Sequence, residues 1–462
     1  MIGGLLEEVG LPATAAERVT LVGDERPYAT PFAVVEAAAS VLGAIGAAAS
    51  LLHEEHGGPA QPVTVRRGHA GASLVGFAFQ RLEEGETPGA PWNRDRPLVK
   101  LYECRDGRWM HLHGEFPHLA ATTCAVLGCE VESPRQVVAE RVARWDGQDL
   151  EDALAEAGTC GAMARSAGEW SAHPQARAVA PLGRVSIEKI GESAPEPLSD
   201  RRPASPDRPL SGVRALDLSR LLAGPTNGRT LAEHGAEVLL VNSPRLTNIP
   251  AFVMDTSHGK RSCCLDLDDP EGVATLRSLV AASDVFSQGY RGGSLAHRGF
   301  GPEALAELRP GIVVVTINCY GDVGPWRLRP GWEQMAQTVS GLAVGQGGAD
   351  HPVLVPAAAC DYTTGYLAAL GTMAALRRRA REGGSYHVRA SLCQTAGWFA
   401  ATAADRPVDA TGFGDVDSYL MTSDTPFGRL HHLAPVAQLP VTPARWEQPT
   451  RPIGSDPPSW RI

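Results

Sequence analysis

The chain has 462 residues, of which 43% are hydrophobic and 20% are charged, and its formal net charge is −10. This length is too great for one compact core, so we expect two or three domains of a soluble globular protein. The acidic excess, with mixed signs along the chain, argues against a nucleic acid partner, because phosphate backbones attract basic surfaces.

The N-terminal stretch MIGGLLEEVG is acidic and lacks the Lys/Arg-led start of a signal peptide. An Ala-, Val- and Leu-rich segment at 31–56 follows with helical spacing, and VTVRR at 63–67 is typical of a strand. The apolar segment contains Glu36 and falls short of the ~18 apolar residues that span a bilayer. We therefore expect a cytoplasmic protein with no membrane partner.

A hairpin and a group of helices are predicted in the next part of the chain. A loop rich in Gly and Pro at 83–97 precedes LVKLYECRDGRWMHLHG at 98–114, which has the pattern of a β-hairpin with an Arg-Asp-Gly turn. Helical segments at 116–180 and a strand near 182–190 follow.

Residues 191–210 are rich in Pro, Ser and Asp with little to bury, which predicts the principal linker. Beyond it, buried-strand patterns alternate with helical patterns, which predicts an α/β fold with a doubly wound parallel sheet. The expected strands are VRALDLS (213–219), EVLLVN (237–242), SCCLDLD, DVFSQG and IVVVTINCYG (312–321), with helices at 270–282 and 302–308. The Pro-rich last sixty residues should wrap over a surface already formed.

The segment at 360–392 has a weaker twin at 35–67. In each copy an acidic residue stands ten positions before a glycine, Asp361 before Gly371 in one and Glu36 before Gly46 in the other. An Ala/Leu-rich helical stretch, a Gly-containing turn and a Val-bearing strand follow in both. Copies this far apart are not a solenoid, whose repeats stack on their neighbours. They indicate a duplicated or a permuted chain.

Several sequence blocks between 210 and 400 resemble the class III CoA-transferases, the group that contains formyl-CoA transferase and carnitine CoA-transferase. The blocks are GVRALDLSRLLAGP, SHGKRSCCLDLDDPEG and CDYTTGYLAALG, in the order of that family. Residues 98–180 are similar to the family's small domain, which follows the nucleotide-binding half there but precedes it here. The resemblance implies a Rossmann-like fold with a smaller α+β domain, permuted or partly duplicated. The expected units are a helix–strand copy and loop (1–97), the small domain (98–190), the linker (191–210), the CoA-binding domain (211–400) and a wrapping tail (401–462).

The resemblance makes Asp361 the catalytic nucleophile of a transferase that moves CoA between an acyl-CoA and a free carboxylic acid. It implies acyl-CoA and a carboxylic acid as substrates, no permanently bound cofactor, no metal and a homodimer. A carboxylate that attacks a thioester divides the exchange into easier acyl transfers. The alternative for Asp361 is a simple helix N-cap, because Asp often precedes a helix.

By the same resemblance, CoA should lie along the strand ends of the sheet. Three positions depart from the family pattern: Gly289 replaces an Asn, His297 replaces an Arg and Asn242 replaces an acidic residue. Arg291 and Arg298 are candidates to replace the lost Arg. The expected CoA contacts are Arg220, Leu221, Leu222, Ala223, Leu265, Gly289, Tyr290 and His297.

Two other functions stay open. One is an acyl-CoA racemase or isomerase of the same superfamily, which would need an acid–base pair and for which His297 is the suggestive imidazole. The other is a degenerate, non-catalytic CoA-binding subunit, favoured by the departures at Gly289 and His297.

Weaker candidates lie elsewhere in the chain. Nine cysteines without a C-x-x-C pair suggest buried, reduced thiols, and Cys360 beside Asp361 has no evident base. Residues 345–348 (GQGG) resemble a phosphate loop only in composition, so we expect a lid or turn. His111 and His113 share a strand face but lack an evident further metal ligand.

Overall fold

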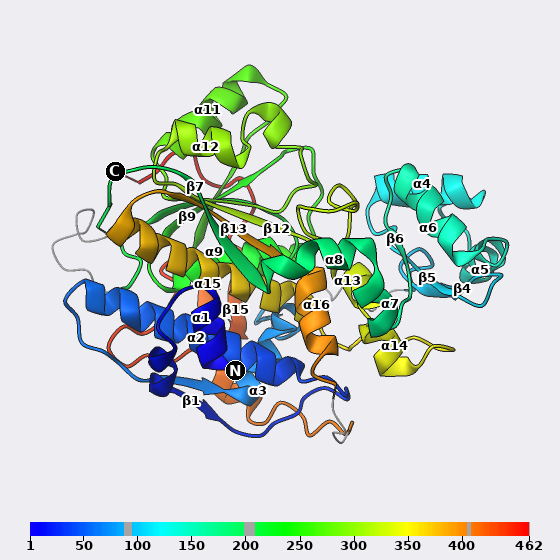
Figure 1. The fold of residues 1–462 in the computed structure, drawn as a ribbon, viewed down its shortest axis with the longest axis horizontal. Helices are drawn as coiled ribbons and strands as arrows, with labels where there is room; N and C mark the ends of the chain where they lie inside the picture. Colours follow the sequence, from blue (N-terminus) through cyan, green and yellow to red (C-terminus); the bar gives the residue numbers. More distant parts are fainter. Residues whose placement is uncertain (87–94, 198–207, 404–407, 462) are drawn as a thin grey trace.

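The computed structural model describes residues 1–86, 95–197, 208–403 and 408–461. Figure 1 shows a large body and a smaller lobe beside it. The body is built around a seven-stranded sheet in the order β10-β9-β8-β11-β12-β13-β7, in which β7 alone runs antiparallel. Its strands are β7 (Val185–Gly191), β8 (Arg214–Leu218), β9 (Glu237–Asn242), β10 (Lys260–Cys264), β11 (Val285–Gln288), β12 (Val313–Asn318) and β13 (Ser385–Ser391).

Helices cover both faces of this sheet, because successive strand residues point to opposite sides. In β8, Ala215 belongs to the core under α9 and α15, whereas Leu216 belongs to the core under α11 and α12. The prediction of a doubly wound α/β sheet is confirmed. The helices of this part are α9 (Ala223–Glu233), α10 (Pro250–Thr256), α11 (Pro270–Ala281), α12 (Pro302–Leu308), α13 (Glu333–Val339), α14 (Leu342–Gly347), α15 (Ala359–Glu382) and α16 (Leu392–Ala400).

The N-terminal copy contributes a small two-stranded parallel sheet, which lies at the bottom of the molecule in Figure 1. Its helix α2 packs against α15, and its strands β1 and β2 pair with each other. A Cβ on Gly46 would lie 2.4 Å from Val63, and one on Gly371 would lie 2.7 Å from Val388. The repeated glycine therefore lets each helix approach the strand that follows it. The elements are α1 (Ile2–Glu8), β1 (Val19–Val22), α2 (Val34–Glu55), β2 (Val63–Arg66) and α3 (Arg67–Ser73).

Helix α2 has the length and hydropathy of a membrane span, contrary to our reading of its sequence, but 94% of its most apolar window is buried inside the protein. Glu36 lies at the start of the helix, in its first turn, and so does not interrupt its apolar part. The 22 residues of α2 have the burial of a core helix.

The smaller lobe has its own core and contains the predicted hairpin, with Gly107 at its turn. Its elements are β4 (Leu101–Glu103), β5 (Trp109–Leu112), α4 (Pro117–Leu127), α5 (Arg135–Val142), α6 (Gly147–Glu156) and β6 (Gly161–Met163). Two short helices, α7 (Ala167–Ala172) and α8 (Pro174–Val179), lead back to the body. The strand expected near 182–190 is β7, which pairs with β13 and so belongs to the large sheet, not to the lobe.

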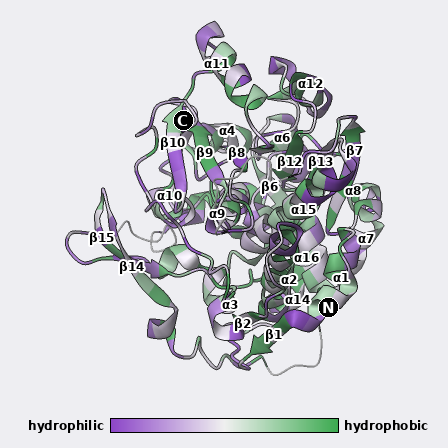
Figure 2. Ribbon diagram, turned by 90° about the vertical axis from the view of Figure 1, so that its left-hand side faces the viewer, coloured by the Kyte–Doolittle hydropathy of each residue, from purple (hydrophilic) through white to green (hydrophobic). Residues whose placement is uncertain are grey.

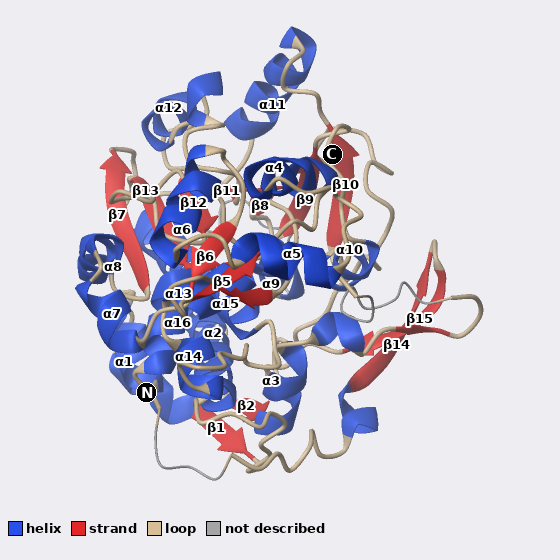
Figure 3. Ribbon diagram, turned by 90° about the vertical axis from the view of Figure 1, so that its right-hand side faces the viewer, coloured by secondary structure: helices blue, strands red, loops and turns tan. Residues whose placement is uncertain are grey.

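Much of the predicted linker, residues 198–207, lies outside the described residues. The tail contains a hairpin, β14 (Leu420–Thr425) with β15 (Gly428–Leu433), which stands out from the body in Figures 2 and 3. Beyond it the chain lies across the edge strand β10, where the Ser262 N–H donates to Asp456 at 2.9 Å. The Trp460 indole donates to the Leu279 carbonyl of α11 at 3.1 Å. Asp456 and Trp460 of the tail thus lie against β10 and α11.

Candidate active site

Asp361 lies in the first turn of α15, but it is not the N-cap. That position belongs to Ala358, whose side chain caps nothing. The cap is supplied by Glu333 at the start of α13, whose two carboxylate oxygens accept the Cys360 N–H at 3.1 Å and the Asp361 N–H at 2.5 Å. Capping therefore does not account for Asp361, and its carboxyl group is left for another role.

The two acidic side chains form a coupled pair. Burial, and then the charge of Glu333, raise the pKa of Asp361 well above its usual range. Burial also raises the pKa of Glu333, but the Gln337 amide donates to it at 2.7 Å and the two backbone N–H groups favour its ionised form. These effects favour a protonated Asp361 beside an ionised Glu333. Our sequence interpretation missed Glu333, which stands in the stretch RPGWEQMAQ between the predicted strand at 312–321 and Asp361.

The N-terminus of α9 meets α15 one turn after Asp361. A Cβ on Gly365 would lie 2.4 Å from the Ala223 carbonyl oxygen and 2.7 Å from Thr226, so only glycine allows this approach. The preceding loop holds Leu221 at φ 69°, which makes it the one non-glycine residue with positive φ in the described part of the chain. Strained backbone of this kind is concentrated at functional sites. The first turn of α9 thus packs against α15 at Gly365, one turn after Asp361.

A pocket of about 270 Å³ opens at the carboxyl ends of the parallel strands, where open α/β sheets bind their ligands. Leu218 at the end of β8, Val241 near the end of β9, Leu265 after β10 and Tyr290 after β11 give it apolar walls. Two of these, Leu265 and Tyr290, are expected CoA contacts. The charged side chains on the pocket are Arg245, Arg298, Asp266 and Asp268.

The charged rim of this pocket is internally paired. Arg298 donates to Asp268 at 2.6 Å, while Arg245 bonds Asp266 at 2.6 Å and Asp268 at 2.9 Å. Of the two arginines proposed to replace the family's phosphate contact, Arg298 lies on the pocket. Arg291 instead donates to the Gly158 carbonyl of the lobe at 3.0 Å.

The other expected CoA residues divide into two groups. Leu222 and Ala223 are buried where α9 begins, next to Leu221. A Cβ on Gly289 would lie 3.4 Å from that of Ser219, so Gly289 lies against the end of β8. His297 is exposed in the short turn Ala296–Arg298 and does not line the pocket, although its neighbour Arg298 does.

Aromatic side chains of the lobe contact two residues of the body, Arg220 and Trp332. The Arg220 guanidinium lies 5.2 Å from the Phe116 ring centre, and burial lowers its pKa. Trp332, which precedes Glu333, lies 5.9 Å from both Phe116 and His113, measured between ring centroids. Small-lobe side chains therefore contact Arg220, an expected CoA residue, and Trp332, the residue before Glu333.

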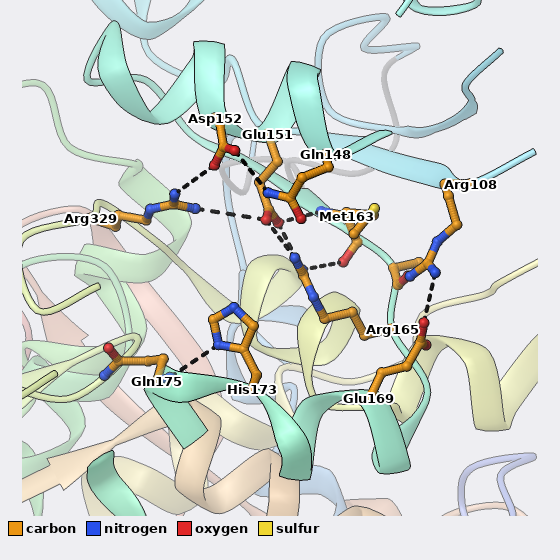
Figure 4. Close-up of polar contacts among 11 residues, drawn as sticks. Arg108, Gln148, Glu151, Asp152, Met163, Arg165, Glu169, His173, Gln175 and Arg329 are labelled. Atoms are coloured by element: carbon orange, nitrogen blue, oxygen red, sulfur yellow. Dashed lines mark hydrogen bonds and ion pairs between the residues drawn. The ribbon is translucent and has the colours of Figure 1, made fainter. Parts of the chain in front are cut away.

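A charged cluster holds the lobe in this place (Figure 4). Arg165 bonds the buried Glu151 at 2.5 and 2.8 Å, and Arg329 from the body reaches Asp152 at 3.2 Å. The Trp326 ring lies within 5.3 Å of the Arg165 guanidinium and 4.3 Å of that of Arg329. Arg329 stands four residues before Glu333, so this cluster joins the lobe to the segment that caps α15.

The weaker candidates do not form a site. Burial lowers the pKa of His111 to about 3 and of His113 to about 4, so both imidazoles are neutral. Burial raises the pKa of the Cys360 thiol well above its usual range, which disfavours a reactive thiolate. Residues 345–347 end helix α14 and do not form the expected lid or turn. Across residues 1–86, 95–197, 208–403 and 408–461, no three or more His, Cys, Asp or Glu side chains gather as a metal site.

Comparison with known proteins gives one family and several relatives. The model of CoA-transferase family III matches residues 10–192 and 210–417. An acyl-CoA transferase of Gibberella moniliformis is 35% identical over 327 residues, which cover 65% of this chain and 58% of that protein. The acetyl-coenzyme A transferase nodX of Hypoxylon pulicicidum is 31% identical over 382 residues, 74% of this chain and 64% of that protein. The chain thus spans 58% and 64% of the length of these two relatives.

Among solved structures, a CAIB/BAIF family protein from Brucella suis is 26% identical and aligns with 48% of this chain and 65% of its own, at a TM-score of 0.40.

Proposed function

Because the chain belongs to CoA-transferase family III, we propose that it moves CoA from an acyl-CoA to a free carboxylic acid, with Asp361 as the nucleophile. The observation that carries this proposal is the position of Asp361. Asp361 lies in the first turn of α15, is not used as a cap, and has its pKa raised by burial and by the charge of Glu333, one turn before the contact of α15 with the N-terminus of α9.

The proposed reaction has four balanced steps. The Asp361 carboxylate attacks the thioester carbonyl, the C–S bond breaks, and a mixed anhydride and CoA thiolate form. The thiolate attacks the Asp361 carbonyl of that anhydride, which releases the first carboxylate and leaves an aspartyl-CoA thioester. The incoming carboxylate attacks this thioester and expels the thiolate again. The thiolate then attacks the new acyl carbonyl, which yields the product thioester and restores Asp361.

The remaining residues of the site have supporting roles in this proposal. The first turn of α9 provides backbone N–H groups near the oxyanion that forms at each attack. The pocket bordered by Leu265 and Tyr290 would hold the nucleotide end of CoA, with Arg298 and Arg245 near its phosphates. Because burial and the charge of Glu333 raise the pKa of Asp361, its carboxyl group must lose a proton before the first attack, and Glu333 would accept that proton.

Intact-mass measurement after incubation with a panel of acyl-CoAs tests this function. We expect a covalent adduct that hydroxylamine removes, with Asp361 in the modified peptide. Asp361→Asn keeps the side chain size and the backbone N–H that Glu333 accepts, so it should fold but form no adduct and transfer no CoA. Exchange of the α-proton without an adduct would support a racemase instead, and binding of acyl-CoA without either would support a binding subunit.

A further inference from the structure

Tyr362, the residue after the proposed nucleophile, joins α15 to two other helices. It is fully buried, and its hydroxyl donates to Asp255 Oδ2 of α10 at 2.7 Å. Arg229 of α9 donates to Asp255 Oδ1 at 2.8 Å and to the Asp255 carbonyl at 3.1 Å. The Arg229 guanidinium also lies 5.8 Å from the Tyr362 ring centre. Tyr362, Asp255 and Arg229 thus form one hydrogen-bonded unit that joins α15, α10 and α9 next to the proposed nucleophile.

The Asp255–Arg229 pair fixes where the Tyr362 hydroxyl must lie. The side chains of Arg229 and Asp255 are only 9% and 5% exposed, and a buried charge that loses its partner is costly. Burial raises the pKa of Tyr362 well above its usual range, so its hydroxyl stays protonated and remains a donor at any working pH.

The Tyr362–Asp255–Arg229 unit is not among the causes that raise the pKa of Asp361. The pKa of Asp361 is raised by burial and by Glu333, not by Asp255 or Arg229. Its effect on the nucleophile is therefore one of position. Glu333 holds the first turn of α15 through its backbone N–H groups, and Tyr362 holds the same turn through a side chain.

The N-terminal copy supports this turn as well. The Phe77 ring lies 6.2 Å from that of Tyr362 with their planes at 29°, and the Leu74 carbonyl accepts the Ala358 N–H at 3.1 Å. Residues that follow the first helix–strand copy thus pack on the start of the catalytic helix in the second.

We propose that Tyr362 is a positioning residue for Asp361, anchored by Asp255 and Arg229. This inference rests on the proposed function, because it needs Asp361 to be the attacking group. A nucleophile must meet its target at close range, and a misplacement of ~1 Å costs about 10²-fold in rate.

Tyr362→Phe removes the hydroxyl and keeps the ring, and Tyr366→Phe is its matched control. Tyr366 lies one turn further along α15, is 2% exposed, and its hydroxyl lies 3.5 Å from the same Arg229. We expect Tyr362→Phe to lower the single-turnover rate of Asp361 labelling by about 10- to 100-fold without a matching rise in KM for acyl-CoA. Tyr366→Phe should label at nearly the wild-type rate.

Equal labelling rates in the two variants would overturn the inference, as would a rise in KM that accounts for the whole loss. The single-turnover rate constant is measured only on sites that take up label, so a smaller folded fraction of either variant does not change it. Asp361→Asn is measured alongside. Transfer retained in that variant refutes the proposed function itself, whereas its loss together with a normal rate in Tyr362→Phe refutes only the role of Tyr362.

Discussion

At the start of α15 lie the carboxyl groups of Glu333 and Asp361, and both pKa values are raised by burial. Their hydrogen bonds influence which of the two groups ionises more readily. Three donors favour the ionised form of Glu333, whereas burial and the neighbouring charge both raise the pKa of Asp361. A nucleophilic carboxylate that begins as an acid becomes active only as pH rises. The apparent pKa of activity then belongs to the pair rather than to either residue.

Glu333→Gln should move the acid limb of the pH profile of kcat/KM to lower pH. The substitution removes the negative charge that raises the pKa of Asp361, so the Asp361 carboxylate persists at a lower pH. The height of the profile is expected to fall too, because an amide accepts the helix N–H groups less well than a carboxylate. An unmoved limb, or a limb displaced to higher pH, would contradict the coupling.

Glu233 of α9 should make the free energy of unfolding depend on pH. Burial raises its pKa from 4.5 to about 8, although Arg229 and Arg208 lower it. Since the folded pKa lies above the unfolded one, this group's stabilisation is full below about 4.5 and is lost as pH rises through about 8. We expect Glu233→Gln to stabilise the protein more at pH 8 than at pH 5, as measured by urea unfolding. An equal effect at both values would refute the shift.

Among the elements, the repeated helix–strand unit was predictable and the contacts between distant helices were not. The spacing of Asp361 and Gly371, echoed by Glu36 and Gly46, predicted both helices, and the close approach to Val63 and Val388 explains it. Tyr362 and Asp255 lie 107 positions apart, and no local period of the sequence relates them.

For the expected CoA residues, too, the sequence predicts some positions and not others. Leu265 and Tyr290 follow buried strands, so the order of strands in the sheet places them at one edge. His297 lies in a short helical turn whose rotational phase the sequence does not fix, and Arg298 faces the pocket in its place.

Helix α2 offers a direct test of the twin site. Glu36 occupies the first turn of α2 as Asp361 does that of α15. However, β1 and β2 form a two-stranded sheet, whereas α15 packs on β7, β12 and β13 of the seven-stranded sheet. We expect Glu36→Gln to leave kcat nearly unchanged, because β1 and β2 form a sheet of two strands and not the seven-stranded sheet whose strand ends border the pocket. A loss as large as that of Asp361→Asn would make the first copy an active site.

In the whole molecule, the parts of the chain before and after the predicted linker contribute strands to the same seven-stranded sheet. Residues before 192 supply β7 to the sheet that residues 214–391 form, and α2 packs against α15. The position of the lobe before residues 214–391, rather than after them, is therefore compatible with a single site. The lobe side chains Phe116 and Glu151 meet Arg220 and Arg329 from the second part.

Limited proteolysis should cut within the predicted linker at 191–210 before anywhere in 210–400, since residues 192–197 are half-buried or exposed, whereas Arg208 and Leu210 at its far end are buried. The nicked protein should still elute as one species under native conditions and keep its transfer activity. Six residue pairs join β7 to β13, and the apolar faces of α2 and α15 remain buried against each other after the cut. A denaturing gel should show two fragments where size-exclusion chromatography shows one peak. Separation of the fragments in native buffer, or early cleavage inside the sheet, would show that the two parts fold as independent units.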